Sequence, residues 1–337
     1  MNIDCAYYSR GVRQPQEPMS LEEAAALTRR GGNFVWIELE EPSTDLMAEA
    51  CEHFGLHELA VEDAGRAHQR PKVESYDDFY LIVYKTARYD ERNRRVDFGE
   101  LDIFLGVGYV IAVRHGAASD PLRARSRVEQ RPELLKTGPA AVVWSMLDVV
   151  VDDYAPVVEG LEAEIEEVER AIFAGRADLT ERIYLLKIQL NELYRALHPL
   201  LAPLEAMERG KFQADPGLVR YFRDIADHVR QLQDEVLALR DQLAAVLEAN
   251  LSLISVHQNE ITAQQNQVVK QLTLVATVFL PLTFVTGFFG QNFGWMVRNI
   301  DSPTMFVVAG IGGLVIPCVA LFVWFRRGGY VQRDGAS

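Results

Sequence analysis

Two long uncharged stretches near the C-terminal end constrain the fold of this 337-residue chain more than any other feature. Residues 272–289 and 305–325 contain no charged side chain. Each stretch is close to the roughly 20 residues that an α-helix needs to cross the hydrocarbon core of a bilayer. One such stretch can be a buried core helix. Two of them, joined by the connector 290–304 and followed by Arg326 and Arg327, predict a pair of transmembrane helices.

The basic residues beside these stretches predict their orientation. Lys270 precedes the first stretch and three arginines follow the second, whereas the connector holds one arginine and one aspartate. By the positive-inside rule, both termini face the cytoplasm and the connector faces out. The N-terminal residues lack the apolar segment of a signal peptide, so we expect the first 265 residues to be cytosolic. The sequence thus predicts a multi-pass protein of the cell membrane.

The cytosolic part is strongly acidic. The whole chain has a formal net charge of -14, and residues 266–337 hold five basic and two acidic side chains, so the negative charge lies in the preceding part. This balance argues against a nucleic-acid partner and favours cations, although it can also serve solubility alone. The three cysteines have no framework spacing, which fits a reducing compartment. No P-loop, GxGxxG or nucleophile elbow appears, so we expect neither an enzyme nor ATP-driven transport.

Residues 1–137 alternate strand and helix patterns and predict an α+β domain. Ser20 and Glu23 have the spacing of a capping box before a helix that reaches Leu27. The other expected elements are a strand at 34–39, a helix at 44–54 ending near Gly55, a strand at 79–84, and a hairpin of 96–105 with 108–114.

From Gly138 the pattern becomes helical. Helices are expected over 139–174 and 178–208, and Asp215-Pro216 is a good start for the next helix. That helix runs from Gly217 to Phe289 and would be about 110 Å long at 1.5 Å per residue. Apolar residues follow one face of it at spacings of 4 and 3: Leu232, Val236, Leu239, Leu243 and Val246. A helix this long would have little to pack on in a monomer, so we expect self-association.

The chain therefore divides into six parts by composition and pattern. These are a cytosolic α/β domain (1–137), a long-helix stalk (138–265), the end of the stalk helix with the first transmembrane helix (266–293), an external loop (294–304), the second transmembrane helix (305–325) and a basic cytosolic tail (326–337).

One face of the first transmembrane helix carries hydroxyl and small side chains. At 100° per residue, a third of the circumference holds Thr273, Ala276, Thr277, Leu280, Thr283 and Gly287, with Asn266 preceding them in register. Such a stripe is typical of a helix that lines a wet pore, where hydroxyl and amide oxygens hold a hydrated cation and Leu280 can form a constriction. The alternative is that the threonines bond to their own helix or to neighbouring helices. The spacing alone leaves both interpretations open.

Two further sequence features suggest metal binding only weakly. Cys51, His53 and His57 are close in sequence, but no second ligand pair of structural-zinc spacing follows them. The acidic run over 159–169 is either a solvated helix face or a region that concentrates cations.

Several segments resemble the CorA family of magnesium and cobalt transporters. Residues 272–293 read LTLVATVFLPLTFVTGFFGQNF, similar to the family's first membrane helix, which ends in Gly-Met-Asn. Four further segments resemble the family's cytosolic signatures: 54–63 (FGLHELAVED), 68–74 (HQRPKVE), 151–154 (VDDY) and 221–228 (YFRDIADH).

The resemblance implies a funnel-shaped homopentamer in which the long helix forms the inner ring of the pore. It places Asn292 at the external mouth, holding the hydrated ion, with Gly290 allowing the turn. It places Thr283, Leu280, Val269 and Asn266 on the pore face. It also implies a regulatory cation site between neighbouring subunits, where Asp63 of the α/β domain meets Asp224 early in the long helix.

The sequence departs from the family pattern at Gln291, where the family usually has Met, and in the external loop. Relaxed signatures occur in the zinc-transporting branch that resembles ZntB. The resemblance to the family implies magnesium as the transported ion. The departures leave zinc, cobalt or nickel transport, with or without proton coupling, as the alternative. An alternative of another class is a membrane-anchored cation sensor or scaffold that conducts nothing. No bound cofactor is expected beyond the transported and regulatory divalent cation.

Overall fold

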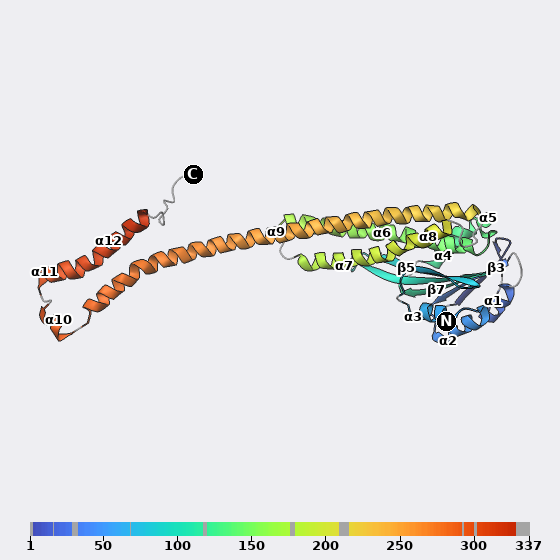
Figure 1. Ribbon diagram of the computed structural model, residues 1–337, viewed down its shortest axis with the longest axis horizontal. Helices are drawn as coiled ribbons and strands as arrows, with labels where there is room; N and C mark the ends of the chain where they lie inside the picture. The colour runs from blue at the N-terminus through green and yellow to red at the C-terminus, as the bar shows by residue number, and fades with distance from the viewer. Residues whose placement is uncertain are drawn as a thin grey trace. The chain divides into compact units, whose positions relative to one another are not determined.

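A computed structural model describes residues 3–15, 17–28, 33–67, 69–116, 120–175, 179–208, 216–291, 293–299 and 302–327. The chain forms two compact units, Met1–Asn250 and Leu251–Ser337 (Figure 1). The long helix α9, Pro216–Phe289, contributes residues to both.

The first unit is built on a seven-stranded sheet in the order β2-β1-β3-β7-β6-β5-β4. Only β3 and β7 pair in parallel, and the other neighbours are antiparallel. The strands are β1 Ile3–Ser9, β2 Val12–Arg13, β3 Asn33–Glu40, β4 Lys72–Ser75, β5 Phe79–Asp90, β6 Arg95–Gly106 and β7 Tyr109–Gly116. The predicted strand at 34–39 and the predicted hairpin are confirmed. The hairpin turns at Gly108, whose φ of 81° favours glycine.

Three short helices cover one face of this sheet: α1 Leu21–Thr28, α2 Thr44–Phe54 and α3 Glu58–Arg66. The capping box is confirmed, since the Ser20 amide donates to Glu23 Oε2 at 2.9 Å and the Glu23 amide donates to Ser20 Oγ at 3.2 Å. Gly55 ends α2 in the left-handed conformation, as predicted. Alternate residues of β3, such as Val35 and Ile37, pack against these helices.

A second set of helices covers the opposite face (Figure 1), on which Phe34 and Trp36 lie. They are α4 Pro121–Glu129, α5 Pro132–Leu135, α6 Ala140–Phe173, α7 Thr180–Leu197, α8 Leu201–Glu208 and the first part of α9. The single helix predicted over 178–208 is wrong, because a 3-10 turn, His198–Leu200, separates α7 from α8. Pro199 has no N–H to donate to the preceding turn, so the regular ladder is interrupted there.

The long helix predicted from Gly217 to Phe289 is confirmed as α9. Its apolar stripe is buried within the same chain, since Leu232, Val236, Leu239, Leu243 and Val246 belong to the core formed with α6 and α7. The expectation that α9 has little to pack on in a monomer is therefore wrong for this part of the helix. The exposed part of α9 begins later: from Leu251 to Leu272 every residue is exposed, including Val256, Ile261 and Val268.

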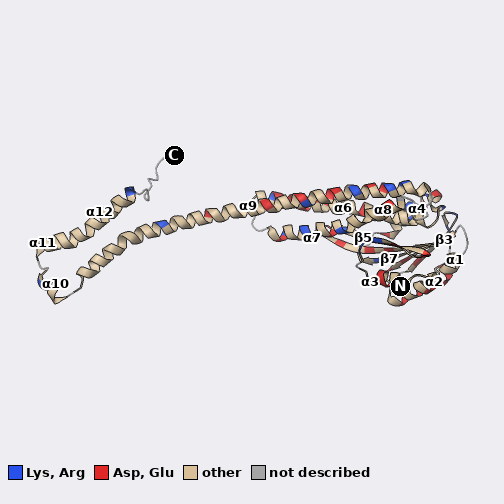
Figure 2. Cartoon of the chain, in the orientation of Figure 1, with Lys and Arg blue, Asp and Glu red and all other residues tan. Residues whose placement is uncertain are grey.

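The second unit contains the two predicted membrane segments. The end of α9 and the run Pro303–Arg327 are both long and apolar enough to cross a bilayer, and neither buries its apolar window inside the chain. Between them lies α10, Gly294–Asn299. The second run comprises α11 Pro303–Met305, the π-helical turn η2 Phe306–Ile311, and α12 Gly312–Arg327. Figure 2 shows charged residues dense on the helices of the first unit and nearly absent along these two segments, until the arginines that end α12.

Candidate functional site

The threonine hydroxyls of the first membrane segment all donate to their own helix. Thr273, Thr277 and Thr283 donate to the carbonyl oxygen four residues earlier at 2.8, 2.7 and 2.6 Å, and Thr286 does so at 2.9 Å. The structure therefore shows the back-bonding alternative. Each hydroxyl oxygen still has lone pairs with which to accept a hydrogen bond. The water shell of a cation offers donors, so back-bonding leaves this face able to receive a hydrated ion.

The helix presents the threonine stripe on the side opposite its half-buried residues. Leu280 and Val269 on the stripe are 72% and 59% exposed, and Asn266, Thr273, Ala276, Thr283 and Gly287 are also exposed, with Thr277 half-buried. At 100° per residue, the side centred roughly opposite Leu280 holds the half-buried Leu274, Val278, Pro281, Leu282 and Val285.

The second membrane segment approaches α9 on that same half-buried side. A Cβ placed on Gly313 of α12 would lie 3.8 Å from Cγ1 of Val285. The neighbouring segment therefore leaves the threonine stripe uncovered within one chain. This is the geometry expected when one face of α9 meets a pore and the other meets a surrounding helix.

Gly290 and Gln291 directly follow the last residue of α9, Phe289. The Gly290 amide donates to the Thr286 carbonyl at 3.0 Å, and the Gln291 amide donates to the Phe288 carbonyl at 3.3 Å. A Cβ at Gly290 would lie only 3.0 Å from the Thr286 oxygen, so a side chain would crowd this turn. Asn292 lies outside the described residues.

Asp63, on α3, has partners that the sequence did not suggest. Lys72 Nζ lies 2.7 Å from Asp63 Oδ2 and 3.0 Å from Glu74 Oε1, and Gln69 Nε2 donates to Asp63 Oδ1 at 3.3 Å. Burial alone would lower the pKa of Lys72, but its hydrogen bonds to Asp63 and Glu74 raise that pKa above its ordinary value. Lys72 therefore stays positively charged throughout the neutral range.

Asp224 lies in α9 on the opposite side of the sheet. Its neighbours Phe222 and Ile225 are buried in the core, whereas the Asp224 side chain is exposed. Because α3 and α9 cover opposite faces of the sheet, one chain does not bring Asp63 and Asp224 together. A site that uses both carboxylates would need a second copy of the chain.

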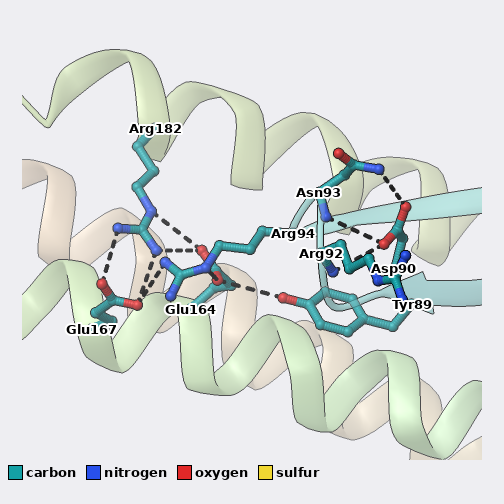
Figure 3. Close-up of polar contacts among 8 residues, drawn as sticks. All are labelled: Tyr89, Asp90, Arg92, Asn93, Arg94, Glu164, Glu167 and Arg182. Atoms are coloured by element: carbon teal, nitrogen blue, oxygen red, sulfur yellow. Dashed lines mark hydrogen bonds and ion pairs between the residues drawn. The ribbon is translucent and has the colours of Figure 1, made fainter.

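The acidic run of α6 is only partly a solvated face. Glu164 is 6% exposed and binds Arg182 Nη2 at 2.5 Å and Arg94 Nε at 3.2 Å, while Tyr89 donates to it at 3.4 Å (Figure 3). Glu167 binds the same two arginines. Through Arg94 these contacts connect the turn between β5 and β6 to α6, and through Arg182 they connect α6 to α7. Glu159, Glu162 and Glu166 are exposed, so the solvated interpretation holds for them.

The Cys51, His53 and His57 cluster has structural contacts. Cys51 Sγ contacts the Leu56 carbonyl oxygen at 3.2 Å, and His57 Nδ1 accepts from the Leu59 amide at 3.2 Å as the N-cap of α3. Among the described residues, no group of three or more His, Cys, Asp or Glu side chains is placed to hold a metal ion.

A row of polar side chains crosses the sheet where the sequence suggested only strands. Lys85, Glu100 and His115 face one another across β5, β6 and β7. Lys85 pairs with Glu100, and His115 contacts Glu41 Oε2 at 2.9 Å and the Ala64 carbonyl oxygen at 2.8 Å. Beside this row Asp102 is fully buried, and burial followed by the negative charge of Glu100 raises its pKa far above its usual range. Burial therefore favours the protonated form of Asp102.

The comparison with family models and the comparison with curated sequences agree on the family. The model of the CorA-like Mg2+ transporter protein family matches residues 31–327. The chain is 32% identical over 288 residues to the cobalt/magnesium transport protein CorA of Thermotoga maritima, covering 84% of this chain and 79% of that protein. It is 27% identical over 299 residues to the putative metal ion transporter YfjQ of Bacillus subtilis, covering 88% and 89%.

Among solved structures, the fold is similar to that of the complete CorA magnesium transporter from Methanocaldococcus jannaschii, with a TM-score of 0.64 and 22% identity over 98% of this chain and 100% of that one. The α+β domain, the long helix and the apolar C-terminal segment fit these matches. The family-model match and the 32% identity to the Thermotoga maritima protein show that the chain belongs to the CorA-like Mg2+ transporter family.

Proposed function

We propose that this chain is one subunit of a membrane channel for hydrated divalent cations, with Mg2+ as the main ion. The observation that carries the proposal is the exposed threonine stripe of α9, which lies on the side away from α12. Mg2+ dehydrates reluctantly and keeps several waters when bound. A wall of hydroxyl oxygens that accept hydrogen bonds suits such a hydrated ion better than a wall of charged ligands. The similarity to a cobalt/magnesium transport protein of Thermotoga maritima and to a magnesium transporter of Methanocaldococcus jannaschii supports the same ion.

In this proposal the stripe lines the pore and the helix end forms its mouth. The pore residues are Asn266, Val269, Thr273, Ala276, Thr277, Leu280, Thr283 and Gly287. Asn292 holds the hydrated ion, Gln291 adds a second amide, and Gly290 allows the turn. Leu280, 72% exposed in one chain, forms the apolar constriction.

In this proposal the channel is a homopentamer, as the family resemblance implies. Support comes from the part of α9 between the core and the bilayer. Ile254, Ile261 and Val268 recur every seven residues and are exposed in a single chain, at 37%, 41% and 64%. Apolar side chains at helical spacing are stabilised when they pack on another copy of the same helix. Both termini lie in the cytoplasm in this proposal. The chain has the six parts that were predicted from the sequence.

The regulatory part of the proposal joins Asp63 of one subunit to Asp224 of its neighbour through a divalent cation. Two carboxylates repel each other unless a cation or a proton lies between them. An ion bound there would link the subunits of the closed ring, and its loss would release them. Such feedback requires the cation to bind the closed state more tightly than the open one.

Thr283 and Thr286 provide a matched test of the pore face. Both hydroxyls donate to the carbonyl four residues earlier, but only Thr283 lies on the stripe. We expect Thr283→Val to lower Mg2+ flux into proteoliposomes about fivefold or more, because each subunit loses one acceptor for the ion's water shell. Thr286→Val removes an equivalent helix contact and should leave the flux near that of wild type. Equal losses in the two variants, or no loss in either, would show that the stripe does not face the ion.

A further inference from the structure

We propose that Lys72 is a built-in counter-cation of the site around Asp63, which a divalent cation must displace in order to bind. Lys72 would thereby set the cation concentration at which the site fills. This inference rests on the regulatory part of the proposed function, because it assumes that Asp63 receives a cation.

Both oxygens of Asp63 are engaged within the chain. Lys72 Nζ lies 2.7 Å from Oδ2, and Gln69 Nε2 donates to Oδ1 at 3.3 Å. The charge of the Asp63 carboxylate is therefore neutralised by an internal ammonium group. A cation that arrives at Asp63 gains a ligand only if Lys72 moves away or remains nearby at the cost of charge repulsion.

Glu74 gives Lys72 a second place to bind. Lys72 Nζ is 3.0 Å from Glu74 Oε1, so the ammonium group already bridges two carboxylates. If a cation takes Asp63, Lys72 keeps its contact with Glu74 and is not left as an unpaired charge. This arrangement makes the exchange reversible, because neither the filled nor the unfilled site leaves a partly buried charge without a partner.

The site is open enough for exchange and firmly placed on the fold. The side chains of Lys72 and Asp63 are 25% and 35% exposed, so an ion or another subunit can reach them. The carbonyl oxygen of Ala64, next to Asp63, contacts His115 Nε2 at 2.8 Å, which ties this end of α3 to strand β7. Asp63 is thus held in position while the long side chain of Lys72 is the part that moves.

Coulomb's law gives the direction and the size of the effect. An ammonium group and a divalent ion at a shared carboxylate repel each other with twice the energy of two unit charges. Removing the ammonium charge is therefore expected to lower the Mg2+ concentration at half-saturation by about tenfold or more, since partly exposed charges are only partly screened.

The test is an Mg2+ titration of limited proteolysis, with the full-length protein in detergent. The midpoint of protection should fall about tenfold in Lys72→Gln and in Lys72→Met, whereas Lys72→Arg, which keeps the charge, should stay near wild type. Lys136→Gln is the matched control, because Lys136 is an exposed lysine that pairs with Glu133 at 2.6 Å on the opposite face of the sheet. It removes the same charge and should not move the midpoint.

Two further variants separate this inference from the function on which it rests. Glu74→Gln should raise the midpoint, because Lys72 is then left with Asp63 alone. Asp63→Asn should abolish protection. If Asp63→Asn protects like wild type, the regulatory site itself is wrong. If Asp63→Asn abolishes protection but Lys72→Gln and Lys72→Met titrate like wild type, the site stands and the role of Lys72 is refuted. Size-exclusion profiles of each variant confirm that it has assembled.

Discussion

Replacing Asn292 with alanine is expected to reduce Mg2+ flux through the reconstituted protein by at least about tenfold. In the sequence Asn292 comes two residues after Gly290, beyond the end of α9 at Phe289. A hydrogen bond to a charged group contributes roughly 1.5–3 kcal/mol, and the hydration shell of Mg2+ takes part of the ion's charge. Losing that contact in every subunit removes the step that captures the hydrated ion.

Asn299 provides the control for Asn292. It is an exposed asparagine at the end of α10 in the same connector, outside the Gly-Gln-Asn segment. Asn299→Ala should conduct like wild type. Flux that survives in Asn292→Ala, measured with an Mg2+ indicator inside the liposomes, would remove Asn292 from the ion's path.

The double replacement Asp63→Asn with Asp224→Asn is expected to abolish the protection that Mg2+ gives against limited proteolysis. Both changes keep the shape of the side chain and remove its charge. Without the two carboxylates, no ion links one subunit to the next, so the digestion rate should be the same with and without Mg2+. The wild-type protein should be digested more slowly as Mg2+ is added.

Asp227→Asn provides the comparison on α9 itself. Asp227 is exposed, lies three residues after Asp224 and pairs with Arg230 at 2.5 Å. This variant loses the same charge from the same helix and should keep the Mg2+ response. Protection that persists in the Asp63 and Asp224 double variant would exclude these two residues from the regulatory site.

The elements of this fold were predictable where local periodicity is strong. Uncharged runs marked the membrane segments, and the spacing of apolar residues marked α9, because a helix and a bilayer each impose a length and a period on the sequence. The hairpin of β6 and β7 was predictable because its turn needs glycine at a positive φ. Pro199 was the missed signal: a proline inside a helical pattern interrupts the hydrogen-bond ladder, and it separates α7 from α8.

Contacts between distant parts of the chain were not predictable in the same way. The pairing of Glu164 with Arg94 and Arg182 joins a strand turn to two helices, and neither periodicity nor spacing encodes such a contact. Asp63 was placed in the site by the family resemblance, but its partner Lys72 depends on how β4 lies beside α3. The apolar stripe of α9 was predicted correctly as a stripe, and only the structure showed that it packs on the chain's own helices.

The candidate pore face depends both on local periodicity, which was predictable, and on a contact between distant residues, which was not. The helical angle placed Thr283 on the stripe and Thr286 off it, which needs only 100° per residue. Gly313 of α12 approaches Val285 on the other side of α9. This is a tertiary contact, and helical periodicity does not predict it. This second fact is what makes the stripe a candidate for the ion path.

The most direct test of the central claim is a competition flux assay with the purified protein in liposomes. Uptake of Mg2+ is measured with and without a pH gradient and in the presence of cobalt, nickel or zinc. We predict Mg2+ uptake that needs no pH gradient, is reduced by the competing divalent ions and is lost in Asn292→Ala. Zinc uptake that depends on a pH gradient, without Mg2+ uptake, would contradict the choice of ion. Failure of every divalent ion to cross would contradict the channel itself and leave the chain as a membrane-anchored cation sensor.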